Sequence, residues 1–139
     1  MKQWEVLLLK IRTGFITNSS STNFLIISKK ELSEEYLYKK LGFKKGSPLE
    51  EQGRTLCDDI MRAVNYGGIR YHNIEAPDYE SIKNVFGEKS AVLFRQRANF
   101  HVYWGYTSSD ESPITQFFTT DSFEIEEKDF YLNGRACVW

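Results

Sequence analysis

Two apolar runs near the N-terminus most limit what this chain can fold into. Residues 3–12 place Trp4, Val6 and Leu8 on one side of a strand and Leu7, Leu9 and Ile11 on the other, so the strand would carry apolar side chains on both faces. Residues 24–28 read Phe-Leu-Ile-Ile-Ser, which is short, apolar and typical of a buried strand. The sequence therefore predicts a sheet in which both strands are buried, the first of them in a central position.

Three helical patterns follow these strands. Residues 31–41 carry apolar side chains at helical spacing and stop at Gly42. A second helix is expected to follow Ser47, a favourable N-cap residue, and to end before Gly67. Residues 77–86 form the third pattern. These patterns predict two or three helices against the sheet.

The last third of the chain is rich in predicted strands. Residues 91–96 and 100–106 are expected to pair as a hairpin, with Gln96 opposite Phe100. This register is chosen because it gathers the apolar side chains on one face, and a slip of one residue would exchange the faces. Further strands are predicted at residues 114–119, 122–126 and 136–139.

The length of 139 residues is typical of one domain, and we expect residues 1–139 to form it. Hydrophobic residues make up 41% of the chain and aromatic residues 15%, which is too apolar for a disordered protein. Together with the element pattern, this composition predicts an α+β fold, with an antiparallel or mixed sheet covered by two or three helices.

Nothing in the sequence predicts secretion or a membrane span. No run approaches the ~18 consecutive apolar residues that a transmembrane helix needs. The apolar run at residues 6–9 is shorter than the apolar core of a signal peptide. The two cysteines, Cys57 and Cys137, do not form a disulfide framework. We therefore expect a cytoplasmic protein with two buried, reduced thiols and no contact with a membrane.

The formal net charge of -1 conceals an uneven distribution of charge. Residues 1–70 hold 12 basic and 8 acidic side chains, whereas residues 71–139 hold 6 basic and 11 acidic ones. Two readings stay open. The charges belong to two solvated faces of opposite sign, or the acidic segment binds a basic partner or imitates nucleic acid.

A hydroxyl-rich segment between the first two predicted strands offers a candidate ligand site. Hydroxyl groups and loop amides can bind a phosphate, and Lys29 and Lys30 follow the segment closely. The candidate ligand-binding residues are Arg12, Asn18, Ser19, Ser20, Ser21 and Thr22. A self-bonded connection between two strands, or a site of protein contact or modification, would use the same residues.

The same segment resembles a known N-terminal signature. Residues 10–26 read Lys-Ile-Arg-Thr-Gly-Phe-Ile-Thr-Asn-Ser-Ser-Ser-Thr-Asn-Phe-Leu-Ile. This run is similar to the start of uncharacterised small proteins of bacteria and their phages. It departs from them in the nine residues before Lys10 and in Thr22-Asn23, where serines are usual. The resemblance implies a bacterial or phage cytoplasmic protein and brings no activity with it.

One enzyme pattern is present in part. Mono-ADP-ribosyltransferases have an arginine, then a Ser-Thr-Ser strand, then Glu-x-Glu, and the order Arg12, Ser20-Ser21-Thr22 and Glu124-Ile125-Glu126 resembles it. The spacing departs from that family, because Arg12 and the serines share one region. A nucleotide-handling enzyme of this kind is the alternative to a binding protein.

A second polar group follows from the predicted hairpin. Arg95, Arg97, His101 and Tyr103 would form a polar surface, either a half-exposed sheet face or a weak nucleic-acid site. His72 and His101 lie on separate elements and no ligand pair has metal-site spacing, so we expect no metal and no cofactor.

These observations favour a small, non-enzymatic, cytoplasmic accessory protein of phage or bacterial origin. It would bind a protein partner or a small phosphate-bearing ligand, and inhibition of a host system is one role that fits such a setting. Nucleic acid is the less favoured partner. The sequence does not predict the oligomeric state.

Overall fold

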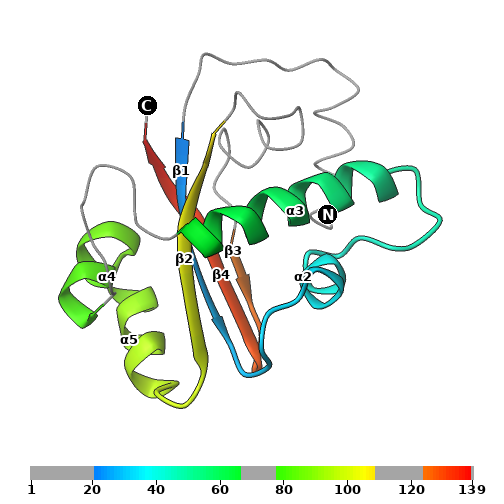
Figure 1. Cartoon of the computed structure of the whole chain (residues 1–139). Helices are drawn as coiled ribbons and strands as arrows, with labels where there is room; N and C mark the ends of the chain where they lie inside the picture. The colour runs from blue at the N-terminus through cyan, green and yellow to red at the C-terminus, as the bar shows by residue number, and fades with distance from the viewer. Residues whose placement is uncertain (1–20, 67–77, 109–123, 139) are drawn as a thin grey trace.

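The computed structural model describes residues 21–66, 78–108 and 124–138, which form a sheet with helices on both faces (Figure 1). In chain order the elements are β1 (Ser21–Ser28), α2 (Glu34–Lys40), α3 (Glu50–Tyr66), α4 (Tyr79–Phe86), α5 (Glu88–Gln96), β2 (His101–Ser108), β3 (Glu124–Glu126) and β4 (Phe130–Val138). The predicted α+β class is confirmed. The strands predicted at residues 3–12 and 114–119 lie outside the described residues.

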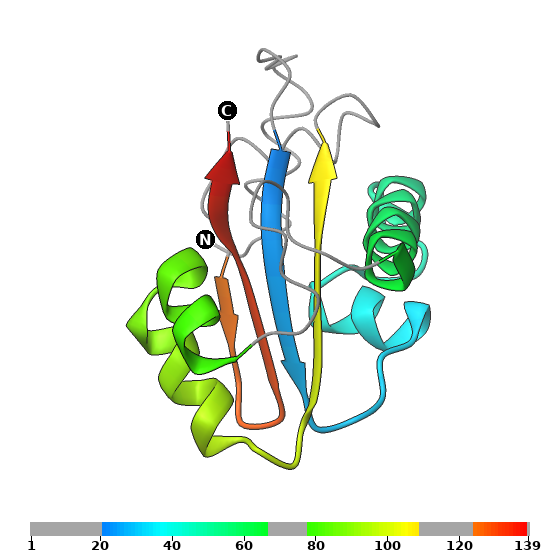
Figure 2. The same ribbon diagram turned by 60° about the vertical axis from the view of Figure 1, so that its left-hand side comes forward.

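The four described strands form one antiparallel sheet in the order β2-β1-β4-β3 (Figure 2). β1 lies inside the sheet, with β2 on one side and β4 on the other. Its side chains from Phe24 to Ile27 are fully buried on both faces, as their unbroken apolar character predicts. Ser21 pairs with Ser108 and with Val138, so the hydroxyl-rich run, predicted as a loop, already ends as a strand.

The core has two halves, one on each face of the sheet. Phe24 and Ile26 of β1 pack with α2 and α3, while Leu25 and Ile27 pack with α4 and α5. The helices predicted at residues 31–41 and 77–86, and the one after Ser47, are confirmed. The structure describes four helices, one more than the sequence predicts.

Residues 91–96 were predicted as a strand, and this was wrong because they form most of α5. The run Ala-Val-Leu-Phe is apolar at every position, and so short a run carries no period that separates strand from helix. In the structure Gly87 adopts φ 98°, which ends α4 and lets the chain turn into α5. Ser90, Ala91 and Leu93 are buried there, while Val92 is exposed.

Since α5 takes the place of the predicted strand, β2 pairs with β1 instead. Trp104 lies opposite Leu25 in that register. The predicted division of faces along β2 is nevertheless confirmed. Val102 and Trp104 pack in the α4/α5 half of the core, and Tyr103 packs in the α2/α3 half.

Two further boundaries differ from the prediction. The second helix begins at Glu50, and Ser47 contributes only its backbone carbonyl, which accepts from Glu50 at 3.2 Å. β4 begins at Phe130, six residues before the predicted strand at 136–139. Asn133 and Gly134 interrupt the apolar pattern there, because both residue types are depleted in strands. Asn133 is nonetheless buried, with its amide bonded to other groups.

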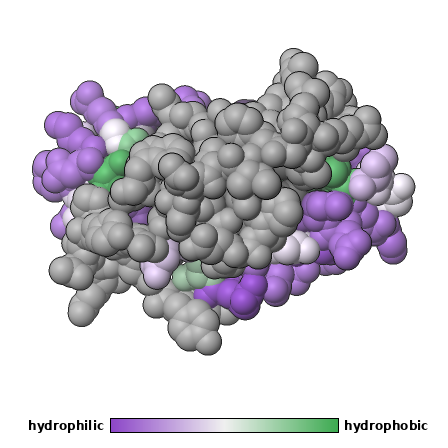
Figure 3. Space-filling model, turned by 90° about the horizontal axis from the view of Figure 1, so that it is seen from above, coloured by the Kyte–Doolittle hydropathy of each residue, from purple (hydrophilic) through white to green (hydrophobic). Residues whose placement is uncertain are grey.

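No helix within the described ranges is both long and apolar enough to pass through a bilayer. Seen from above, the described residues at the rim of the molecule are mostly hydrophilic, with a few hydrophobic ones between them (Figure 3).

Candidate functional site

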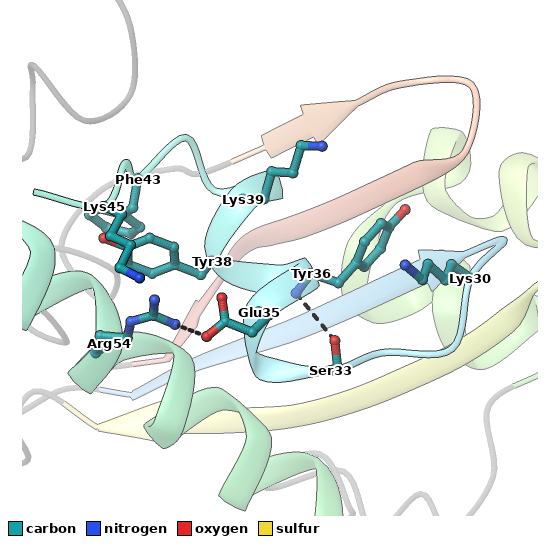
Figure 4. A pocket seen from close by; sticks show the side chains of 9 residues that line it. All are labelled: Lys30, Ser33, Glu35, Tyr36, Tyr38, Lys39, Phe43, Lys45 and Arg54. Carbon is teal, nitrogen blue, oxygen red and sulfur yellow. Dashed lines mark hydrogen bonds and ion pairs between the residues drawn. The ribbon is translucent and has the colours of Figure 1, made fainter.

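A pocket of about 490 Å³ lies beside α2, between the chain that leaves β1 and the start of α3 (Figure 4). Its lining comes from one stretch of sequence. The residues that line it are Lys30, Ser33, Glu35, Tyr36, Tyr38, Lys39, Phe43, Lys45 and Arg54. Four of these side chains are cationic, one is anionic and three are aromatic, so the pocket is basic with flat apolar walls.

The position of α2 is set by contacts at both of its ends. Ser33 caps the helix by accepting from the backbone N–H of Tyr36 at 3.2 Å. Just before this cap, the backbone N–H of Leu32 donates to the hydroxyl of Tyr103 on β2 at 3.0 Å. At the other end Lys40 donates to Asp129 at 2.9 Å. These contacts hold the pocket-lining helix against the sheet.

One wall of the pocket is a pair of stacked rings. The rings of Tyr38 and Phe43 lie 5.5 Å apart at an angle of 26°. α3 approaches this pair at Gly53, where an added Cβ would lie only 2.6 Å from the ring of Phe43. The Tyr38 hydroxyl donates to the carbonyl of Lys44 at 3.1 Å. A glycine at this point therefore lets α3 close onto the aromatic wall.

Arg54 connects that wall with Glu35, which supplies the only carboxylate among the described residues of the lining. Its guanidinium lies 4.0 Å from the centre of the Tyr38 ring and donates to Glu35 Oε1 at 2.5 Å. The Glu35 hydrogen bond raises the pKa of the Arg54 guanidinium. Figure 4 shows this pair crossing from α3 to α2. Arg54 is therefore charged and held from two sides.

The three lysines of the lining keep their charge free for a ligand. Within the described part of the chain, no carboxylate pairs with Lys30, Lys39 or Lys45. Lys30 lies 5.2 Å from the centre of the Tyr36 ring, which orients its stem along the pocket. All three lysine side chains are exposed, so an anion from solvent can reach them.

Of the predicted ligand-binding residues, the two that the structure describes, Ser21 and Thr22, do not line this pocket. Arg12, Asn18, Ser19 and Ser20 lie outside the described residues. Ser21 and Thr22 begin β1 and pair with β2 and β4. Lys30 follows the far end of β1, and eight residues of strand span roughly 25 Å. Lys29 and Lys30 therefore cannot hold one phosphate together with Ser21 and Thr22.

The four residues of the predicted polar surface divide between the two faces of the sheet. Arg95 stacks on Tyr79, with its guanidinium 3.8 Å from the ring centre, in the α4/α5 half. Arg97 donates to the carbonyl of Glu127 at 2.7 Å. His101 and Tyr103 stack on each other at 6.3 Å, and Tyr103 belongs to the other half. The predicted hairpin placed them together, and α5 separates them.

A second polar cluster lies within the α4/α5 half. The Tyr131 hydroxyl is 2.8 Å from Ser90 Oγ and donates to Glu124 Oε2 at 2.7 Å. The Asn133 amide donates to Ser90 Oγ at 2.8 Å and to the carbonyl of Phe86 at 3.2 Å. Burial raises the pKa of Tyr131 to about 12. Ser90, Tyr131 and Asn133 are buried and bonded to one another, so this cluster stabilises the fold.

The acidic side chains of strand β3 also form ion pairs. Lys89 pairs with Glu126 at 2.7 Å and with Glu124 at 3.4 Å. On the other side of the sheet, Lys40 pairs with Asp129 at 2.9 Å and with Glu127 at 3.6 Å. Part of the acidic second half of the chain therefore serves to hold one helix on each face.

The buried thiol of Cys57 is not a catalytic group. Cys57 is fully buried, and burial raises its pKa to about 12, so it is no nucleophile at neutral pH. Its predicted burial is confirmed. Among the described residues, no three His, Cys, Asp or Glu side chains come together as metal ligands would.

Sequence reasoning missed the pocket, although one signal for it was present. Residues 36–45 read Tyr-Leu-Tyr-Lys-Lys-Leu-Gly-Phe-Lys-Lys, in which aromatic and basic side chains alternate. In the sequence these lysines contribute to the basic first half of the chain. Comparisons of the chain with protein-family models, curated proteins and solved structures found no match.

Proposed function

We propose that this protein is a non-enzymatic, cytoplasmic accessory protein of bacterial or phage origin that binds a phosphate-bearing ligand in the pocket beside α2. One observation carries the proposal: among the described residues, four cationic side chains and a single carboxylate line a hollow of about 490 Å³. Pockets of roughly 300–1,000 Å³ accommodate small molecules. Inhibition of a host system is one role for such a protein.

The chemistry of the lining supports an anionic ligand. Arginine presents a planar fork of donors that matches a phosphate, and lysine adds a mobile point charge. Arg54 supplies the fork, while Lys39 and Lys45 supply the point charges. The rings of Tyr36 and Tyr38 offer flat surfaces for an organic group attached to the phosphate.

The enzyme alternative has less support. Glu124 and Glu126, which would be the acidic pair of an ADP-ribosyltransferase, are bonded to Tyr131 and Lys89. Their expected partners Arg12 and Ser20 lie outside the described residues. A nucleic-acid site at Arg95 and Arg97 is also less favoured, because both side chains are held by contacts within the chain. A protein partner stays a prediction.

A matched pair of charge-reversal variants tests the proposal. Lys30→Glu with Lys45→Glu removes two cations from the lining, whereas Lys29→Glu with Lys44→Glu changes the two neighbouring exposed lysines outside it. Calorimetric titration with AMP at about 0.15 M ionic strength is the measurement, because the Debye length is then about 8 Å. We expect the first variant to lose at least about tenfold in affinity and the second about threefold or less, because exposed charges act mainly at short range.

The matched control separates a specific site from general attraction. If both double variants lose affinity equally, the pocket is not the site and only the total charge matters. If wild-type protein binds neither AMP nor inorganic phosphate, the proposed function is wrong. Thermal unfolding of each variant shows that the comparison is made between folded proteins.

A further inference from the structure

We infer that Glu35 is a built-in competitor for the pocket, and that the ligand is a phosphomonoester whose doubly charged phosphate replaces Glu35 on Arg54. The inference rests on the proposed function and names the ligand class for the same pocket. It follows from the unequal way in which the two partners of the Glu35–Arg54 ion pair are held.

Arg54 is fixed independently of Glu35. Its guanidinium lies over the Tyr38 ring, 4.0 Å from the ring centre, and that ring is stacked on Phe43. α3 carries Arg54 next to Gly53, whose close approach to the ring pair fixes the height of the helix above the wall. Arg54 therefore keeps its position when Glu35 moves away.

Glu35, in contrast, is held by little else. Its side chain is 78% exposed, whereas that of Arg54 is 30% exposed. Exposed ion pairs contribute little to stability, because solvent screens both charges and the side chains lose rotamer freedom. Rotation of Glu35 into solvent is therefore an inexpensive way to free the donors of Arg54.

The charge of the ligand decides whether the exchange takes place. A carboxylate and a phosphodiester each carry one negative charge, as Glu35 does, and gain little by replacing it. A phosphomonoester carries a charge of about -1.5 to -2 at neutral pH and has three acceptor oxygens. The unpaired Lys39 and Lys45 attract that second charge as well. Because Glu35 occupies Arg54, the pocket favours a phosphomonoester, which carries the second charge, over a phosphodiester.

Three probes that share a phenyl ring test the ligand class. Phenyl phosphate is a monoester, methyl phenyl phosphate is a diester, and benzoate is a carboxylate. We expect wild-type protein to bind phenyl phosphate about tenfold or more tightly than the other two. Equal affinity for the monoester and the diester would overturn the assignment.

Removal of the competitor tests the exchange itself. We expect Glu35→Gln to bind phenyl phosphate about three- to fivefold more tightly than wild type, because no carboxylate has to leave Arg54. Glu34→Gln, which removes the neighbouring exposed carboxylate outside the lining, should change the affinity by less than about twofold. A Glu35→Gln variant that binds phenyl phosphate as wild type does contradicts the inference.

An Arg54→Gln background distinguishes exchange from simple repulsion. If Glu35 acts by occupying Arg54, then Glu35→Gln has no effect once Arg54 is absent. If the tightening persists in Arg54→Gln, Glu35 is only a repelling charge and the exchange is overturned. A protein that binds AMP through Lys30 and Lys45 but ignores Glu35 rejects this inference alone, whereas absence of all phosphate binding rejects the proposed function.

Discussion

On the α4/α5 face of the sheet, polar side chains are buried and bonded to one another, whereas on the α2/α3 face they surround an open pocket. Tyr131, Asn133 and Ser90 satisfy each other without solvent. Lys39 and Lys45 keep exposed charges with no carboxylate partner in the described part of the chain. A buried, satisfied group stabilises a fold, whereas an exposed, unpaired charge is available to a ligand.

The aromatic residues show the same division. On the α4/α5 face the guanidinium of Arg95, on α5, lies over the ring of Tyr79, on α4, and this contact joins the two helices. On the α2/α3 face Tyr38 carries Arg54 in a similar stack, but the arginine also faces the pocket. An arginine–tyrosine contact therefore stabilises the fold on the α4/α5 face, whereas on the α2/α3 face it positions an arginine that can bind a ligand. The following predictions test this contrast.

The largest effect is expected at the buried cluster. Asn133→Ala removes the amide that donates to Phe86, Ser90 and Tyr131, so three buried acceptors each lose one donor and the lost side chain leaves a cavity. We expect the free energy of unfolding to fall by about 2–4 kcal/mol, while AMP binding by the folded protein is unchanged. Urea unfolding measures the first and calorimetry the second.

Asn84→Ala, on the exposed side of α4, is the matched control. It should change the free energy of unfolding by less than about 0.5 kcal/mol. Equal losses in the two variants would mean that the buried cluster does not stabilise the α4/α5 face.

On the α2/α3 face, the buried thiol of Cys57 predicts a loss of stability at high pH. Burial raises its pKa from 9.0 to about 12, so the folded protein keeps the thiol neutral where the unfolded chain ionises it. The stabilisation is therefore complete below about pH 9 and is lost as the pH rises toward 12. When the pH is raised from about 8 to about 10.5, we expect the free energy of unfolding of the wild-type protein to fall by about 2 kcal/mol, a loss that Cys57→Ala does not show. An identical pH slope in wild type and Cys57→Ala would contradict it.

Gly53→Ala tests the close contact behind the pocket wall. Helix propensity alone would make alanine more stable than glycine by about 0.5–1 kcal/mol. The new Cβ would lie 2.6 Å from Phe43 and 2.9 Å from Tyr38, so we expect a net loss of about 1–2 kcal/mol and weaker AMP binding. Urea unfolding and calorimetry are the measurements. An increase in the free energy of unfolding would contradict the prediction, because it would show that the rings of Tyr38 and Phe43 can move aside without cost.

The smallest effect concerns the helix cap beside the pocket. Ser33→Ala removes the acceptor for the backbone N–H of Tyr36 and should cost about 0.5–1 kcal/mol. Ser47→Ala should cost less than about 0.5 kcal/mol, because the structure uses the backbone carbonyl of Ser47. Urea unfolding measures both losses. A larger loss of stability for Ser47→Ala than for Ser33→Ala would support the side-chain cap that the sequence predicted at Ser47.

The sequence predicted the elements whose signals are local. The unbroken apolar run of β1 predicted a strand buried on both faces, and the alternation along β2 predicted which side chains share a face. The strand predicted at residues 91–96 was wrong because a fully apolar run fits a strand and a helix equally well. Only the turn at Gly87 and the packing of Leu93 made that segment helical.

The pocket was harder to predict than the core. Its residues all lie between positions 30 and 54, yet their side chains meet only because α2 and α3 pack at Gly53. The sequence favours the hydroxyl-rich segment as the ligand site, since Lys30 follows it closely in sequence. An extended strand separates residues that sequence places near one another, and this distance cannot be seen before the strand is recognised.

By itself, the sequence determined the α+β class, the three helices that have clear start and stop residues, and the buried centre of the sheet. Caps, glycine stops and hydrophobic periods act between near neighbours, so they can be read from the order of residues. Only the tertiary structure decided that β2 pairs with β1, that β4 begins at Phe130, and that four cations surround one hollow. These features depend on packing between elements, which local preferences do not specify.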